Sequence, residues 1–284
     1  MKLEIFKTMW GFEGDFETAC KEAKEAGFDG IEGRSPLDED ERNHWKTCLE
    51  KYDLLFIAEI VTGGGFVPAR HDSLQKHIND VEEGIKNSLE LNPRFMTCMG
   101  GCDAWSEEDS MAFFKRAMDI AKKYKIEISF ETHRSRSLFT PWVTRRMVEA
   151  LPQMKLTLDI SHWCVVTERL MDTELDTIRA VAPHVHHFHA RVGYAQGAQV
   201  PHPAAPEYKE ALASHQECWE IAWDAQQVHG MQITTMTPEF GPDGYLHTLP
   251  FTNVPVADLW EINCWMAETE RTHYDNYLQR KVLA

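Results

Sequence analysis

The chain has 284 residues, 43% of them hydrophobic and 26% charged, and its formal net charge is −16. This size and composition suit one α/β barrel, which needs no disulfides to fold. The negative charge repels phosphate backbones and anionic lipid, so it argues against nucleic-acid and membrane partners. We expect no membrane span and no signal peptide. The seven cysteines show no disulfide framework, which favours reduced thiols and a cytoplasmic location.

Short β-type runs alternate with longer helical patterns along the whole chain. The first of these runs is LEIFKTMWG, and seven more follow it. The eight expected strands span residues 3–11, 28–35, 54–64, 94–101, 125–133, 155–163, 184–192 and 231–240. Helical patterns lie at 15–27, 71–91, 106–124, 167–182, 206–230 and 256–281.

Eight successive strand-helix units without a linker predict a single (β/α)8 TIM barrel domain over residues 1–284. A doubly wound open sheet is the alternative, but KTMWGFEG after the first strand is no Gly-rich phosphate fingerprint. The Pro-rich segment 192–208 interrupts the alternation of strand and helix patterns. We expect it to form an extended loop between the seventh strand and its helix, with a functional or packing role.

Polar residues gather at the ends of the last four expected strands, which is where such barrels carry their chemistry. These residues are Glu131, Asp159, His162, His187, His189 and Glu239. Alternation with apolar neighbours directs Glu131 and Asp159 into the barrel. Three carboxylates packed together repel one another, and a divalent cation resolves that conflict. Carboxylates with one imidazole suit Mn, Mg, Co or Zn.

The stretch HVHHFHARVGY, residues 184–194, holds four histidines in six positions. His189 is the expected metal ligand. His187 points the same way two residues lower in the barrel. We expect His184 and His186 to face the helices and to be structural, because isolated histidines are more often satisfied core residues than catalytic groups.

The motifs FETH, LDISH, HFHAR and TPEFG follow one another on expected strands five to eight. In this order they resemble the sugar phosphate isomerase/epimerase family of xylose isomerase-like TIM barrels, in the AP endonuclease 2 superfamily. The resemblance covers the architecture of essentially the whole chain. It implies one divalent metal ion, with Mn as the first expectation and Mg, Co or Zn as alternatives. The ligands it implies are Glu131, Asp159, His189 and Glu239.

The resemblance also implies the roles of individual residues. Glu131 and Glu239 would form the acid/base pair on opposite sides of a substrate carbon, and His162 would touch the substrate. The metal would polarise a carbonyl and stabilise an enediolate, while a carboxylate removes the adjacent proton. The implied activity is isomerisation or epimerisation of a small sugar or sugar derivative.

The substrate pocket departs from the family pattern. Ketose 3-epimerases carry a glutamate six residues after the first ligand and an arginine six residues after the histidine. Here these positions are Ser137 and Ala195. Arg191 and His133 stand nearby instead. The resemblance is therefore closer at the metal centre than in the pocket.

Further pocket residues come from the ends of the early strands. Glu32 and Glu59 either bind sugar hydroxyls or form structural pairs with arginines. Trp10 either walls the sugar site or packs in the core. Arg191 binds a carboxylate or phosphate, or neutralises the acid cluster. The expected substrate contacts are His162, Arg191, His133, Glu59 and Trp10.

Three other functions compete with a sugar isomerase. A metal-dependent lyase or dehydratase would use the same site on a keto-sugar or keto-inositol. An endonuclease would need a basic DNA face, which the charge of −16 opposes. A non-catalytic sugar-binding barrel would have no use for four metal ligands. The loop 192–208 and the Trp-rich last helix also offer surfaces for a homo-oligomer.

Overall fold

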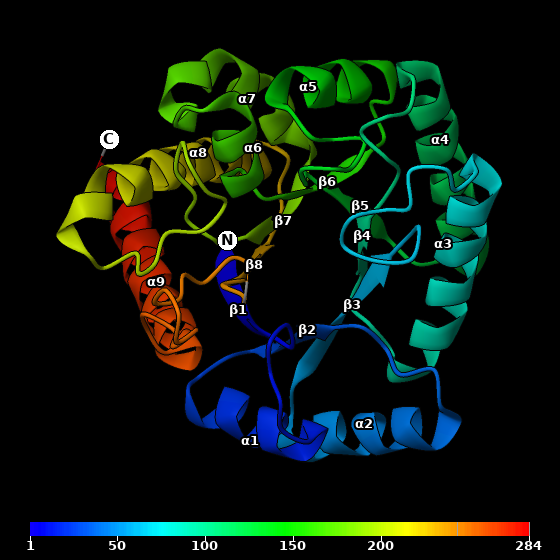
Figure 1. Ribbon diagram of the computed structural model, residues 1–284, viewed down its shortest axis with the longest axis horizontal. Coiled ribbons are helices and arrows are strands. Elements are labelled where there is room, and N and C mark those ends of the chain that lie inside the picture. Colours follow the sequence, from blue (N-terminus) through cyan, green and yellow to red (C-terminus); the bar gives the residue numbers. More distant parts are fainter. Residues whose placement is uncertain (243, 284) are drawn as a thin grey trace.

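Eight parallel strands close into a barrel in chain order, and β8 pairs with β1 (Figure 1). The structure is a computed structural model that describes residues 1–242 and 244–283. Asp243 and Ala284, which belong to the expected domain 1–284, lie outside the described residues. The strands are β1 Lys2–Thr8, β2 Gly30–Gly33, β3 Leu55–Val61, β4 Met96–Met99, β5 Ile128–Glu131, β6 Lys155–Leu158, β7 Val185–His189 and β8 Ile233–Thr237. The expected TIM barrel is confirmed.

Helices surround this barrel on the outside (Figure 1). They are α1 Phe16–Glu25, α2 Glu39–Tyr52, α3 Leu74–Ser88, α4 Glu107–Tyr124, α5 Pro141–Ala150, α6 Ser161–Thr167, α7 Leu175–Val181, α8 Lys209–Val228 and α9 Leu259–Leu283. Short 3-10 turns are η1 Leu89–Leu91, η2 Met171–Glu174, η3 Ala182–His184 and η4 Pro206–Tyr208. Six of the described helices begin at a side-chain cap that accepts a backbone N–H: Asp15, Asp38, Ser73, Ser106, Thr140 and Asp258. Within the described ranges, no helix has the length and apolar character of a membrane span.

The expectation that the sixth strand runs to residue 163 is wrong. β6 ends at Leu158, and α6 begins at Ser161. The Asp159 carboxylate accepts the backbone N–H of Ser161 at 2.9 Å, which turns the chain into the helix. His162 therefore lies on a helix rather than on a strand.

The expectation that His186 faces the helices is also wrong. Pairing between β6 and β7 jumps from Val185 to His187, which leaves His186 as the extra residue of a β-bulge. Its ring centroid lies 4.6 Å from that of Phe95. Phe95 belongs to a buried cluster with Phe6 and Ile57 that is separate from the main core between strands and helices. His187 lies inside the barrel, as expected.

The loop 192–208 packs onto the barrel. Val200 and Gln199 are buried, and the backbone N–H of Gly193 donates to His215 Nε2 on α8 at 3.1 Å. A Cβ on Gly193 would lie 2.6 Å from Ser161 O, so this close approach requires glycine. The loop is thus a packing element that joins α6, α8 and the end of β8.

Candidate functional site

Four side chains converge at the carboxyl ends of neighbouring strands. Glu131 ends β5, Asp159 follows β6, His189 ends β7 and Glu239 lies two residues beyond β8. Each offers one ligand atom, and these atoms all lie within 4.8 Å of one another. His189 Nδ1 is 3.5 Å from Glu131 Oε1 and 3.1 Å from Glu239 Oε2. The four residues singled out in the sequence are therefore brought together in one cluster.

Hydrogen bonds from the FETH and LDISH motifs hold Asp159. Thr132 Oγ1 accepts the Asp159 backbone N–H at 2.8 Å and donates to the Asp159 carbonyl at 2.8 Å. Asp159 is fully buried. Its side chain also contacts Ser161 and Arg191. The carboxylate is thus fixed in position from both neighbouring strands.

Two amide side chains fix the segment that carries Glu239. Gln199 donates to the Gly241 carbonyl at 3.1 Å and accepts the Gly241 N–H at 2.8 Å. Asn263 on α9 makes the same pair of bonds to Phe240, at 3.1 and 3.0 Å. These paired bonds hold the irregular chain after β8, so Glu239 does not depend on strand pairing for its position.

The two sides of the His189 ring face different partners. Nδ1 points toward the carboxylate cluster. Nε2 lies 3.0 Å from Glu32 Oε1. Glu32 also lies 3.2 Å from His187 Nε2 and accepts a 3.0 Å hydrogen bond from Thr97 Oγ1. Glu32 is thus engaged by barrel side chains, with only 3% of its surface exposed.

Arg191 lies in the middle of the acid cluster. It pairs with Asp159, and its Nη1 is 3.5 Å from Glu239 Oε2. Its Nε donates to Ser161 Oγ at 3.1 Å, and Nη1 donates to the Glu239 carbonyl at 3.1 Å. The guanidinium is 1% exposed. Of its two expected roles, neutralising the acids is the one for which the contacts are present.

Burial and charge shift the protonation of the cluster. Burial raises the pKa of Glu131 to about 7. Burial also raises the pKa of Asp159, against the opposing effect of Arg191. Burial by itself would lower the pKa of His189, but the charges of Glu239, Glu32 and Glu131 outweigh it and raise that pKa well above its ordinary value. The cluster therefore retains protons that a cation would displace.

The residues present fit a divalent metal ion. Among the described residues, neither Glu131 Oε2 nor His189 Nδ1 makes a hydrogen bond of good geometry, although both atoms are buried. Three carboxylates and one imidazole nitrogen form a donor set typical of Mn, Mg or Zn. Glu131, His133 and His162 form another close group. Arg191 Nη2 lies 2.7 Å from His162 Nε2 and also pairs with Asp159, so the guanidinium borders both groups.

The rings of the expected substrate residues His133 and His162 lie against each other beside Arg191, with their planes inclined by 49°. Their ring centroids are 3.8 Å apart, and both residues are buried. Burial, and then the charge of Arg191, lowers the pKa of His133 well below its usual value. Burial likewise lowers that of His162, with a further effect from His133. Two neutral imidazoles therefore border the cluster.

Aromatic rings close the mouth of the site. Trp10 lies 4.8 Å from Tyr245 and 5.6 Å from Phe66, measured between ring centroids. With Met99 they cover a cavity of about 10 Å³ above Glu131 and Glu239, which has room for about one water molecule. A molecule larger than water therefore enters only when an aromatic side chain moves.

Glu59 lies to one side of this cavity. Its carboxylate is 3.5 Å from Arg34 Nε, and both residues line a neighbouring cavity of about 240 Å³. Burial raises its pKa to about 7, against the opposing charge of Arg34. The structure places Trp10, His133 and Arg191 at the mouth cavity, and it places Glu59 and His162 beside it. Glu32 lies deeper in the barrel, against His187 and His189.

Sequence reasoning missed Phe66, Met99 and Tyr245. Phe66 lies in the connection after β3 and Tyr245 in the connection after β8, where no periodic pattern singles out a side chain. Met99 ends β4, so its position alone could have identified it.

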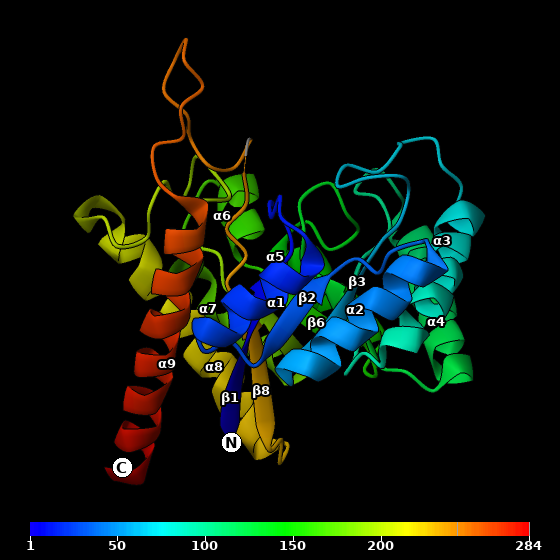
Figure 2. The same cartoon turned by 90° about the horizontal axis from the view of Figure 1, so that it is seen from below.

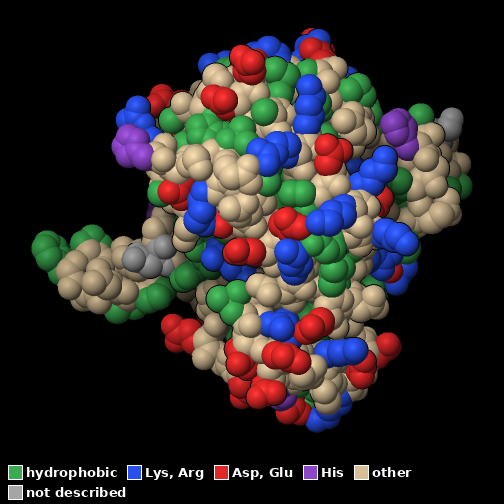
Figure 3. Space-filling view, turned by 90° about the vertical axis from the view of Figure 1, so that its right-hand side faces the viewer, with side chains coloured by type: hydrophobic (Ala, Val, Ile, Leu, Met, Phe, Trp, Pro, Cys, Tyr) green, Lys and Arg blue, Asp and Glu red, His purple; other side chains and the backbone are tan. Residues whose placement is uncertain are grey.

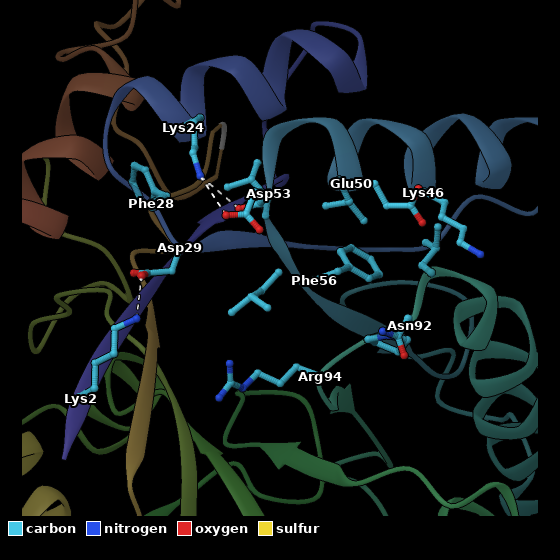
Figure 4. Close-up of a pocket in the computed structure, with 15 residues that line it drawn as sticks. Lys2, Lys24, Phe28, Asp29, Lys46, Glu50, Asp53, Phe56, Asn92 and Arg94 are labelled. Atoms are coloured by element: carbon cyan, nitrogen blue, oxygen red, sulfur yellow. Dashed lines mark hydrogen bonds and ion pairs between the residues drawn. The ribbon is translucent and has the colours of Figure 1, made fainter.

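A larger cavity lies at the opposite end of the barrel (Figure 4). Its volume is about 710 Å³, and its lining includes Lys2 at the start of β1 and Leu55 at the start of β3. Lys2 pairs with Asp29 at 3.5 Å and Lys24 with Asp53 at 3.8 Å. This cavity is remote from the carboxylate cluster, so its size does not make it the reaction site.

The model of the xylose isomerase-like TIM barrel family matches residues 20–203. The chain belongs to this family. No curated protein matches the sequence significantly.

Solved structures with the same fold include enzymes of different activities. The chain is similar to D-allulose 3-epimerase from Methylomonas sp. in complex with D-allulose, with 13% identity, a TM-score of 0.66, and 96% of this chain and 98% of that chain covered. It is similar to endonuclease IV from Thermus thermophilus, with 12% identity, a TM-score of 0.61, and 97% and 100% covered. A xylose isomerase-like TIM barrel protein from Mycobacterium smegmatis in complex with magnesium shows 14% identity, a TM-score of 0.60, and 84% and 91% covered. At these identities the likeness shows the fold alone.

Proposed function

We propose that the protein is a divalent-metal-dependent isomerase or epimerase of a small sugar or sugar derivative. The observation that carries the proposal is the buried set of Glu131, Asp159, His189 and Glu239, whose ligand atoms converge within 4.8 Å at the carboxyl end of the barrel. Its fold is shared with an epimerase bound to D-allulose and with a protein bound to magnesium.

The arrangement supports proton transfer next to a carbonyl group. A divalent ion bound by the four residues would polarise the carbonyl of the substrate. Glu131 ends β5 and Glu239 follows β8, so the two carboxylates enter the cluster from different sides, and one can remove a proton while the other returns one. Trp10, Phe66 and Tyr245 would keep water out during the transfer.

The finer parts of the proposal concern the ion, the partners and the compartment. Mn is the proposed ion because the donor set is rich in oxygen and contains one nitrogen. The protein is proposed to form a homo-oligomer. It is also proposed not to bind nucleic acid, because its net charge of −16 repels phosphates. A cytoplasmic location is proposed because the seven cysteines are free thiols.

Solvent exchange tests the proposed chemistry. The Mn-loaded protein is incubated in D2O with a panel of ketoses and keto-sugar acids, and products are analysed by NMR and mass spectrometry. We expect deuterium at a carbon next to the carbonyl, with the carbon skeleton unchanged. Loss of water from the product would indicate the lyase instead.

Variants identify the groups that move the proton. Glu131→Gln and Glu239→Gln are each expected to lower the exchange rate by about 10²–10⁴-fold. Glu270→Gln, which changes a buried glutamate on α9 outside the site, is the matched control. Wild-type exchange rates in both site variants would contradict the assigned acid/base pair.

A further inference from the structure

Glu32 lies beneath the carboxylate cluster and away from the mouth. It sits in the middle of β2, and its carboxylate reaches across the barrel to β7. It is one of the residues that the sequence assigned to sugar hydroxyls or to an arginine pair. Among the described residues, its carboxylate instead contacts the side chains of Thr97, His187 and His189.

His189 can serve a cation through only one of its two ring nitrogens. Nδ1 lies on the side of Glu131 and Glu239, at 3.5 and 3.1 Å. Nε2 lies 3.0 Å from Glu32 Oε1, within hydrogen-bond distance. A coordinating nitrogen must offer a lone pair, so the proton of the neutral ring must be on Nε2. An anionic acceptor at Nε2 favours that tautomer over the other one.

The carboxylate of Glu32 is itself held in place. Thr97 Oγ1 donates to Oε1 at 3.0 Å, and His187 Nε2 lies 3.2 Å from Oε2. His187 is anchored in turn, with Nδ1 2.8 Å from Thr235 Oγ1. Both carboxylate oxygens are therefore engaged. The contacts to His187 and His189 use different oxygens of the Glu32 carboxylate, and both have hydrogen-bond lengths.

We infer that Glu32 is a positioning residue that fixes the tautomer and ring orientation of His189, so that Nδ1 presents its lone pair to the metal site. This inference rests on the proposed function, since it assumes that the cluster binds a divalent ion. A carboxylate behind a ligating histidine raises the basicity of that histidine and restrains its rotation. Loss of such a partner typically weakens metal binding by about 10–100-fold.

Metal affinity tests the inference directly. Mn2+ is titrated into wild-type protein, Glu32→Gln and Glu32→Ala, and the free ion is counted by electron paramagnetic resonance. We expect the Kd of Glu32→Ala to rise by about 10–100-fold. Glu32→Gln should lose less affinity, because the amide oxygen still accepts the Nε2–H bond without the charge. Glu270→Gln, another buried glutamate exchanged for glutamine, should bind Mn2+ like the wild type.

A second readout does not depend on Mn2+ affinity. In metal-free protein labelled with 15N-histidine, we expect a protected Nε2–H of His189 that is lost in Glu32→Ala. With Mg2+ bound, Nε2 should keep its proton while the Nδ1 signal shifts. If Glu32→Ala fails to fold, Glu32→Gln carries the same comparison.

The outcomes separate this inference from the proposed function. If the wild-type protein binds no Mn2+, the proposed function is contradicted. The Nε2–H signal of His189 would still show whether Glu32 accepts that hydrogen bond. Equal Mn2+ affinity and an unchanged Nε2–H signal in Glu32→Ala would overturn the inference alone. A higher KM for the sugar at saturating Mn2+, with unchanged metal affinity, would also overturn it, because that pattern belongs to a residue that binds the sugar.

Discussion

Arg191 shows how single residues balance charge in this site. It pairs with Asp159 and approaches Glu239, and its Cζ atom lies 4.8 Å from the ring centroid of Tyr245 and 5.4 Å from that of Trp10. One fully buried cation thus links the proposed ligands to the aromatic mouth. Removal of one partner from a buried ion pair leaves the other charge without compensation.

Arg191→Met is expected to lower the free energy of unfolding of the metal-free protein by about 3–5 kcal/mol. Added Mn2+ should restore part of this loss, because a bound ion supplies positive charge to Asp159. Urea denaturation with and without Mn2+ measures both effects. Arg146→Met is the control, since Arg146 forms an exposed pair with Glu107 and should change stability by less than about 1 kcal/mol. Wild-type stability in Arg191→Met would contradict the proposed charge balance.

At the scale of the secondary-structure elements, the contact between α8 and α9 buries a carboxyl group that has no cationic partner within the part of the chain that the structure describes. Glu270 on α9 is fully buried, and Gln216 on α8 donates to its Oε1 at 2.8 Å. Its Oε2 has no hydrogen-bond partner among the described residues. Burial raises the pKa of this carboxyl to about 8. The packed helices therefore favour the neutral acid.

This packing predicts a pH dependence of stability. Between the pKa of an unfolded glutamate, about 4.3, and the folded value, the folded chain keeps a proton that the unfolded chain releases. The free energy of unfolding should therefore fall as pH rises to about 8, by at most about 1.4 kcal/mol per pH unit.

Glu270→Gln should remove this pH dependence, since the amide does not ionise. Thermal unfolding at several pH values should show the variant gaining on the wild type as pH rises. Glu268→Gln, on the exposed side of the same helix, is the control. A constant difference in Tm across the pH range would show that Glu270 does not titrate in the folded protein.

The most prominent feature of the whole molecule outside the barrel is a projecting hairpin arm (Figures 2 and 3). It spans residues 247–256 between β8 and α9, on the same side as the candidate site. Leu249 and Val254 are half exposed and Phe251 is fully exposed. The tip therefore contributes no packing to this chain, and exposed apolar side chains of this kind are typical of surfaces that meet another molecule.

Phe251→Ser is expected to change the free energy of unfolding of the monomer by less than about 0.5 kcal/mol, and so to leave its Tm unchanged. Thermal unfolding and light scattering measure the stability and mass of the same sample. Thr252→Ala, next to Phe251 on the arm, is the control. A lower Tm together with a lower mass would show that the arm packs against a second copy of the chain, as in the proposed homo-oligomer.

The barrel was predictable because alternating strand and helix patterns are local properties of the sequence. All eight expected strands are present, and each is shorter than its apolar run because the final residues turn into loops. α6 was not predictable from LDISHW, since a hydrogen bond from Ser161 to Asp159 bends a strand-like run. The bulge at His186 arises from pairing between strands, which no single segment encodes.

The candidate site was predictable in part. The positions of Glu131 and Asp159 follow from the alternation of their strands. The contacts of Glu32 with His187 and Arg191 with Glu239 join residues that are 155 and 48 positions apart. Such contacts depend on barrel closure, so the sequence alone left the roles of Glu32 and Arg191 open.

The number of Mn2+ ions bound per chain tests the central claim most directly. Equilibrium binding is measured for the wild type, Glu239→Gln and the control Glu270→Gln. We predict about one ion per chain in the wild type and the control, and much weaker binding in Glu239→Gln, which loses a charged ligand. No bound Mn2+ in the wild type, or equal binding in all three proteins, would contradict the assignment of the four-residue cluster as a metal site.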